Sequence, residues 1–111
     1  MIARIWRRRV ESTGMKDYEL FETHDMLPTF LKQPGIVAVV FGRANGYCTS
    51  ISVWNDMPAV EALATSETFK AMNRKLEETT MSIGEESTEI MEIVGGYLPA
   101  AYTGIPREHF I

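Results

Sequence analysis

The order of elements along the sequence predicts an α+β fold in which strands and helices follow one another as β-α-β-β-α-β. Four short segments alternate or run continuously in apolar residues, and two longer ones repeat apolar residues at helical spacing. An Asn45-Gly46 pair, typical of a tight hairpin, separates the two middle strands. Because each β-α-β half crosses over right-handed, the strands should form a four-stranded antiparallel sheet with both helical regions on one face, the ferredoxin-like plait.

The first half of the chain is expected to form a strand, a kinked helix and a second strand. The strand covers residues 2–10, and the helix runs from residue 15 to about 31. Pro34-Gly35 ends the helix before a Val-rich strand over residues 36–43. Pro28 lies inside the helical pattern and predicts a kink, because proline has no backbone N–H to donate.

His24 stands out by its place in this helix. The apolar stripe of the helix is expected to follow three leucines, Leu20, Leu27 and Leu31. His24 lies inside that stripe, one turn before Pro28, and could accept a phenolic proton near neutral pH. The alternative is a partly buried histidine bonded to a backbone carbonyl. Since the helices lie outside the sheet, His24 would reach a pocket only near its rim.

The second half is expected to contain two more strands and a helix in two segments. The strands cover residues 47–54 and 87–94, and residues 83–86 form a loop before the last one. The helical segments run from Pro58 to about residue 64 and from Glu67 to about residue 81. Residues 1–98 therefore form the predicted domain, and residues 99–111 an apolar tail that packs on a partner subunit or across the pocket mouth, with disorder as the alternative.

Composition narrows the classes of function. The 111 residues suffice for one domain, and a net charge of −4 disfavours a nucleic-acid partner. No apolar run approaches the roughly 20 residues that span a bilayer, so no membrane partner is expected. The first residues have no apolar stretch of signal-peptide type, which predicts a cytoplasmic protein. Cys48 is the only cysteine and has no metal-ligand spacing around it, so neither a disulfide nor a metal is expected.

One face of the predicted sheet has no helix to cover it. Ile51 and Val53 are expected to face the helices. The open face would then carry the other side chains of two strands, Arg4, Trp6, Arg8, Cys48, Ser50, Ser52 and Trp54. A monomer rarely exposes a large contiguous apolar patch, so a homodimer with C2 symmetry is predicted. The space enclosed between two such sheets would be an amphipathic pocket, or the tryptophans would simply fill the dimer core.

Three stretches of the sequence resemble one known family. They are the opening Met-Ile-Ala-Arg-Ile-Trp, the Gln33-Pro34-Gly35 helix end before a Val-rich strand, and residues 52–63 followed by 66–71. Over about residues 1–98 the chain resembles the antibiotic-biosynthesis-monooxygenase type of dimeric α+β barrel. The resemblance implies a cofactor-independent monooxygenase that binds a small aromatic or polycyclic molecule, of phenol, hydroquinone or anthrone type, in a pocket between sheet and helices.

Other activities of the same fold stay open as alternatives. They are a non-catalytic ligand-binding or stress-related dimer, a lactone isomerase or lyase, and a haem-degrading monooxygenase. Trp54 matches a Trp of the haem-degrading branch. Asn73, however, stands where that branch has the axial His ligand of the haem iron, and Trp6 or Arg7 stands where it has an Asn on the first strand. Because two of the three signature residues are missing, haem degradation is disfavoured and no cofactor is expected.

The candidate site residues combine the pattern with the resemblance. Three are expected to be catalytic: His24, Trp54 and Arg8. Five are expected to bind the substrate: Trp6, Arg4, Ser52, Phe69 and Asn73. Tryptophan offers a flat surface for an aromatic ring, and Asn73 could hydrogen-bond a substrate oxygen or lie on the surface. A buried arginine needs a partner, which would be an anionic substrate oxygen or a salt bridge to Glu89 or Glu92.

Overall fold

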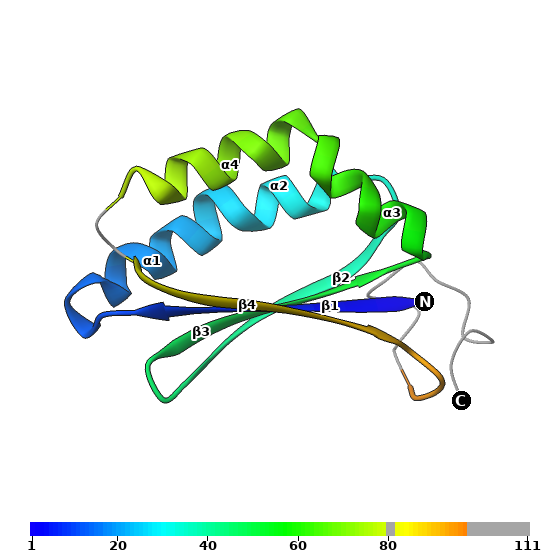
Figure 1. The fold of residues 1–111 in the computed structure, drawn as a ribbon, viewed down its shortest axis with the longest axis horizontal. Coiled ribbons are helices and arrows are strands. Elements are labelled where there is room, and N and C mark those ends of the chain that lie inside the picture. Colours follow the sequence, from blue (N-terminus) through cyan, green and yellow to red (C-terminus); the bar gives the residue numbers. More distant parts are fainter. Residues whose placement is uncertain (80–81, 98–111) are drawn as a thin grey trace.

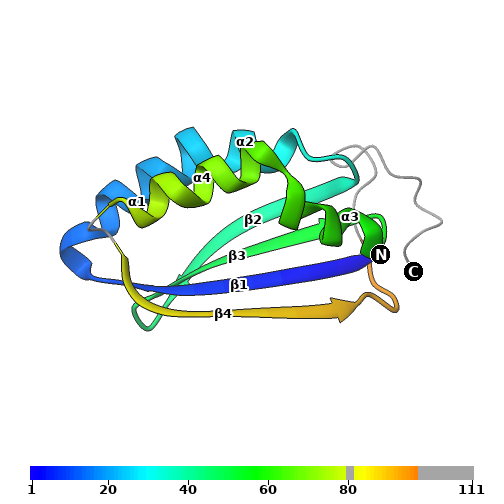
Figure 2. The ribbon, with the colours of Figure 1, turned by 45° about the horizontal axis from the view of Figure 1, so that its top comes forward.

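The computed structural model of the chain describes residues 1–79 and 82–97, and the predicted tail over 99–111 lies outside them. Four antiparallel strands form one sheet in the order β2-β3-β1-β4. The strands are β1 (Ile2–Val10), β2 (Ile36–Ala44), β3 (Tyr47–Trp54) and β4 (Ser82–Glu92). Both helical regions lie over the same face of this sheet (Figures 1 and 2). The predicted ferredoxin-like fold is thereby confirmed.

The helical layer consists of two broken helices. The first comprises a short turn η1 (Ser12–Gly14), α1 (Met15–Phe21), a π-helical segment η2 (Glu22–Met26) and α2 (Leu27–Leu31). The second comprises α3 (Met57–Glu61), a 3-10 segment η3 (Ala62–Thr65) and α4 (Glu67–Glu77). The side chains of Asp56 and Ser66 accept hydrogen bonds from the first turns of α3 and α4 and fix where those helices begin.

Two turns require glycine. Asn45 and Gly46 both have positive φ, 53° and 80°, which confirms the predicted tight hairpin between β2 and β3. Gly35 has φ 85°, and a Cβ there would lie 2.6 Å from the Cβ of Ala59. Its carbonyl accepts a hydrogen bond from the backbone of Asn55 at 2.9 Å, so the ends of α2 and β3 meet without room for a side chain.

The kink predicted at Pro28 is present as the π-helical segment η2. The backbone N–H of Leu27 donates to the carbonyl of Glu22, five residues earlier, just before the proline that cannot donate. The extra residue in this turn shifts the phase of the helix. The prediction that the leucine stripe is buried was wrong: Leu20 is 53% exposed, and Leu31 and His24 are also exposed. The buried side consists instead of three aromatic residues and one methionine: Tyr18, Phe21, Phe30 and Met26.

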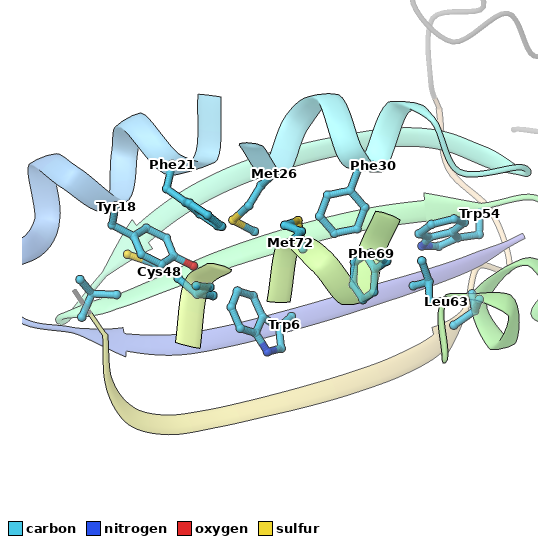
Figure 3. Close-up of a cluster of buried hydrophobic side chains, with 13 residues drawn as sticks. Trp6, Tyr18, Phe21, Met26, Phe30, Cys48, Trp54, Leu63, Phe69 and Met72 are labelled. Atoms are coloured by element: carbon cyan, nitrogen blue, oxygen red, sulfur yellow. The ribbon is translucent and has the colours of Figure 1, made fainter. Parts of the chain in front are cut away.

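The two faces of the sheet were also assigned the wrong way round. Trp6 and Trp54 point toward the helices (Figure 3), with Cys48, Ser50 and Ser52 buried on the same side. Ile51 lies on the opposite face and is 37% exposed. The alternation of side chains along a strand defines two faces of the sheet, but it does not determine which face packs against the helices. The two tryptophans decide it, because each removes far more apolar area from water than an isoleucine or valine does.

The last strand begins earlier than expected. The predicted loop over residues 83–86 is part of β4, and α4 ends at Glu77 rather than near residue 81. β1 pairs with this first part of β4, so that Arg8 lies opposite Glu86, and a bulge follows between Arg8 and Val10. This pairing adds a carboxylate to the face that the helices cover.

Candidate functional site

A cavity of about 140 Å³ lies between the helix-covered face of β1 and β4 and the helices η2, α2 and α4. Part of its wall is apolar and consists of Trp6, Met26, Phe30, Phe69 and Met72. The rest is polar and consists of Arg4, Arg8, Asn73, Glu77, Glu86 and Thr88. Spacings of three and four residues along α4 and of two along β1 bring these side chains to one space. The cavity therefore combines an aromatic wall with charged groups of both signs.

An ion pair lines the cavity at Arg8. A single carboxylate oxygen of Glu86 accepts hydrogen bonds from the indole Nε1 of Trp6 and from Arg8, each at 3.2 Å. The Arg8 side chain is mostly buried, and its Nε has no hydrogen-bond partner within the described residues. The Glu86 carboxylate orients the Trp6 ring in the wall, and it neutralises Arg8.

Arg4 differs from Arg8 because its guanidinium has no carboxylate partner. It is half-buried, lies 5.5 Å above the ring centre of Phe69, and forms no ion pair or side-chain hydrogen bond within residues 1–79 and 82–97. Burial lowers the pKa of Arg4, and the negative charge of Glu86 partly offsets this. The group still carries its charge, since arginine titrates far above neutral pH. A permanent cation that forms no ion pair with a described residue therefore faces the cavity.

The aromatic wall continues into the core behind it. The ring of Phe30 packs edge-on against Phe69, with centroids 5.6 Å apart, and lies 6.3 Å from Trp54 (Figure 3). Trp54 is fully buried, and its Nε1 donates to the hydroxyl of Ser52 at 2.9 Å. Ser52 in turn donates to the backbone carbonyl of Arg4 at 3.3 Å. Trp54 and Ser52 thus stabilise the aromatic wall of the cavity, through Phe30, and strand β1, through the carbonyl of Arg4.

The structure brings five of the eight predicted site residues to the cavity: Arg4, Trp6, Arg8, Phe69 and Asn73. Ser52 and Trp54 are core residues beside it, and His24 is exposed on the kinked helix outside it. Glu89 pairs with Arg7 at 4.0 Å instead of with Arg4 or Arg8. The salt bridge expected of Glu89 or Glu92 is made by Glu86.

Sequence reasoning did not assign the other six lining residues to the site, and the reason is clear for four of them. Glu86 was placed in the expected loop and Thr88 in the strand after it, although their spacing of two would put them on one face of a longer strand. Met26 and Phe30 were missed because the leucine stripe was taken as the buried side. Among the described residues no group of three or more His, Cys, Asp or Glu could hold a metal ion.

No helix in the described part of the chain is long and apolar enough to cross a membrane.

Neither a protein-family model nor a curated protein sequence matches the chain. Solved structures match its fold. A protein of unknown function from Nitrosomonas europaea, NE2512, has a TM-score of 0.73 at 16% identity, with 89% of this chain and 94% of that one covered.

Two further matches have an activity in their description. One, described as an antibiotic biosynthesis monooxygenase, has a TM-score of 0.68 at 14% identity and covers 85% of this chain and 99% of its own. SnoaB, a cofactor-independent oxygenase from Streptomyces nogalater, has a TM-score of 0.66 at 18% identity, with 84% of this chain and 92% of that one covered. At these identities the likeness concerns the fold, which is that of the antibiotic-biosynthesis-monooxygenase structures, as the sequence predicted.

Proposed function

We propose that this protein binds a small electron-rich aromatic molecule, of phenol or hydroquinone type, in the cavity beside Trp6 and oxidises it with O₂ without a cofactor. The observation that supports this most is the pairing of an aromatic wall with the unpartnered cation of Arg4. Such a wall binds the ring, and such a cation attracts an anionic group of the substrate into the cavity. SnoaB, which shares the fold, is described as a cofactor-independent oxygenase.

The proposed reaction needs no other reductant. A phenol with a free para position loses its hydroxyl proton, and the resulting anion carries negative charge on the para carbon. That carbon reduces O₂ and forms a bond to one oxygen atom. Loss of the carbon-bound hydrogen then releases the second oxygen as water and leaves a quinone. All four electrons come from the substrate, and the protein supplies position and electrostatic stabilisation.

The proton acceptor in this proposal is Glu77. Its side chain lines the cavity and forms no ion pair or hydrogen bond with any described residue. Glu86 lines the cavity too, but its carboxylate already accepts from Trp6 and Arg8. His24, the base predicted from the sequence, lies outside the cavity, so the geometry gives it no path to a bound ring.

Oxygen consumption with a para-unsubstituted phenol tests this function. We expect uptake of O₂ with formation of quinone and no hydrogen peroxide, and one atom of labelled oxygen in the product. Glu77→Gln should lower the rate by about 100-fold, as loss of a general base does. Glu78→Gln, at the exposed neighbouring position, should leave it unchanged. Binding without O₂ uptake would point to a non-catalytic protein, and turnover without O₂ to an isomerase or lyase.

We also propose that two copies of the chain pair through the sheet face that the helices leave open. Val40, Ile51 and Ile5 are neighbours across β2, β3 and β1 on this face. Val40 is 58% exposed, and Met91 of β4 is exposed beside Ala3. Val40, Ile51 and Ile5 form a row of aliphatic side chains across three strands, and Glu89 continues it on β4, where Met91 lies diagonally beside the row. A largely aliphatic face of this kind is the self-complementary surface that a C2 interface uses.

A charge placed in the middle of that row tests the dimer. We expect light scattering to give twice the chain mass for the wild type and the single-chain mass for Ile51→Lys, because the new ammonium would be buried in the interface without a partner. Leu20→Lys places the same charge on the exposed side of the helical layer and should leave the dimer intact. A monomeric wild type at micromolar concentration would refute the proposal.

A further inference from the structure

We propose that the ligand of this cavity is an aromatic molecule of one ring that carries a carboxylate, and that Arg4 is the counter-ion of that carboxylate. This inference rests on the proposed function, since it names the substrate class of the same cavity. It follows from three features of the described residues: the pairing of the cations, the distribution of charge along β1, and the size of the cavity.

Arg4 is a half-buried cation that has no carboxylate partner among the described residues. Three other cations are paired with carboxylates: Arg8 with Glu86, Arg43 with Glu22, and Lys75 with Asp25. Arg4 is half-buried against the Phe69 ring with no such partner in the described part of the chain. A half-buried charge that lacks a partner loses hydration without compensation. A bound anion would supply the missing interaction.

The charges are arranged so that the two ends of the cavity differ. Arg4 and Arg8 lie four residues apart on β1, which separates their Cα atoms by about 13 Å. The end at Arg8 is neutralised by Glu86, whose negative charge would repel a second carboxylate there. Trp6 lies between the two arginines on the same face of β1, so a ring against it has its carboxylate directed to Arg4.

Arg4 also lies where the cavity meets a more open hollow. Arg4, Phe69 and Asn73 line both spaces, and the hollow extends to Val60 and Leu63 with a volume of about 340 Å³. A carboxylate held at this boundary keeps contact with water on one side while its ring is enclosed on the other. This lowers the cost of removing the anion from water. Asn73 is placed to donate a further hydrogen bond to it.

The size of the cavity limits the ring system. Its volume of about 140 Å³ is close to the roughly 150 Å³ that holds a benzene molecule in an engineered apolar cavity. A second fused ring would have to extend into the hollow beyond Arg4, or else displace Phe69 or Met72 from the wall. Both are buried, and Phe69 is held edge-on by Phe30. The inference therefore selects a benzoate-like ligand over the polycyclic molecules that the resemblance allows.

Titration calorimetry with three probes tests this inference on the whole chain. Benzoate and benzamide have the same shape and differ in charge, and 1-naphthoate adds a ring. We expect benzoate to bind at least about tenfold more tightly than benzamide, because a hydrogen bond to a charged group is worth that much or more. Arg4→Met should abolish this preference. Arg4→Lys should retain part of it, and Arg74→Met, which removes an exposed charge outside the cavity, should leave it unchanged.

Each contrary outcome identifies the step that fails. Equal affinity for benzoate and benzamide would overturn the role of Arg4 and leave the proposed aromatic cavity standing. Tighter binding of 1-naphthoate than of benzoate would overturn the one-ring limit. If neither single-ring probe bound at millimolar concentration, the inference would be wrong, whereas the oxygen-uptake experiment decides the proposed oxidation separately. Circular dichroism of the Arg4 variants would separate loss of binding from loss of fold.

Discussion

Replacing Trp54 by alanine is expected to lower the free energy of unfolding by about 4 kcal/mol, as truncation of a large buried aromatic does. The side chain has no exposed surface, and its ring lies beside Phe30 under the helical layer. The substitution would leave a void where β3 ends and would also remove the donor to Ser52. Since domains are typically stable by only about 5–15 kcal/mol, the loss should be plain in chemical denaturation.

Two milder variants separate packing from hydrogen bonding. Trp54→Phe keeps an aromatic ring against Phe30 and gives up part of the volume and the Nε1 donor, so it should cost less than the alanine variant. Ser52→Ala removes only the hydroxyl between Trp54 and the backbone of Arg4, at a cost of about 1 kcal/mol. A Trp54→Ala protein as stable as the wild type would mean that this tryptophan does not belong to the core. Loss of ligand binding in that variant would not by itself place Trp54 in the site.

The order of elements could be predicted from the sequence because it depends on local signals. Asn45-Gly46 determines a hairpin, Pro28 disturbs a helix, and Ser66 begins one, whatever surrounds them. The inward face of each element depends on the rest of the molecule. The alternation in β3 fits either Ile51 or Trp54 against the helices, and the choice follows from burying both tryptophans together.

The residues of the candidate site could likewise be predicted where a local pattern determines them, and not where the packing of other elements does. Arg4, Trp6 and Arg8 were grouped correctly because a spacing of two residues keeps them on one face wherever the strand packs. Glu86 joins them through the pairing of β1 with β4, which the Gly84 region concealed behind an apparent loop. His24 was misplaced because the side of the helix that it shares with Leu20 and Leu31 faces outward, whereas the opposite side, with Tyr18 and Phe30, is buried. The helical wheel groups these side chains correctly, but it does not say which group faces the sheet.

Removing the guanidinium of Arg43 is expected to be the other large perturbation. Arg43 forms a two-pronged ion pair with Glu22, with one pair of atoms 3.0 Å apart, and its guanidinium lies 5.8 Å above the ring centre of Tyr18. The Glu22 side chain is only 6% exposed. Arg43→Met would leave that carboxylate buried and unpaired, at a cost of about 3 kcal/mol near neutral pH.

The pH dependence of this loss identifies its cause. Burial raises the pKa of Glu22, and Arg43 partly counters the rise, so removing Arg43 should raise the pKa further. When the folded pKa exceeds the unfolded one, the folded state binds the proton more tightly. The destabilisation is then absent below the unfolded pKa and grows as pH rises through the folded pKa. Unfolding free energies of wild type and Arg43→Met should therefore differ much less at about pH 4 than at about pH 8.

A second substitution at Glu22 distinguishes charge from packing. Glu22→Gln in the Arg43→Met background removes the buried charge and keeps most of the side-chain volume. The double variant should therefore be more stable than Arg43→Met alone at the higher pH and no more stable at the lower one. An equal loss at both pH values, with no recovery in the double variant, would show that Arg43 stabilises the fold through its contact with Tyr18. The ion pair would then have no net role, because the desolvation of its two charges would cancel their attraction.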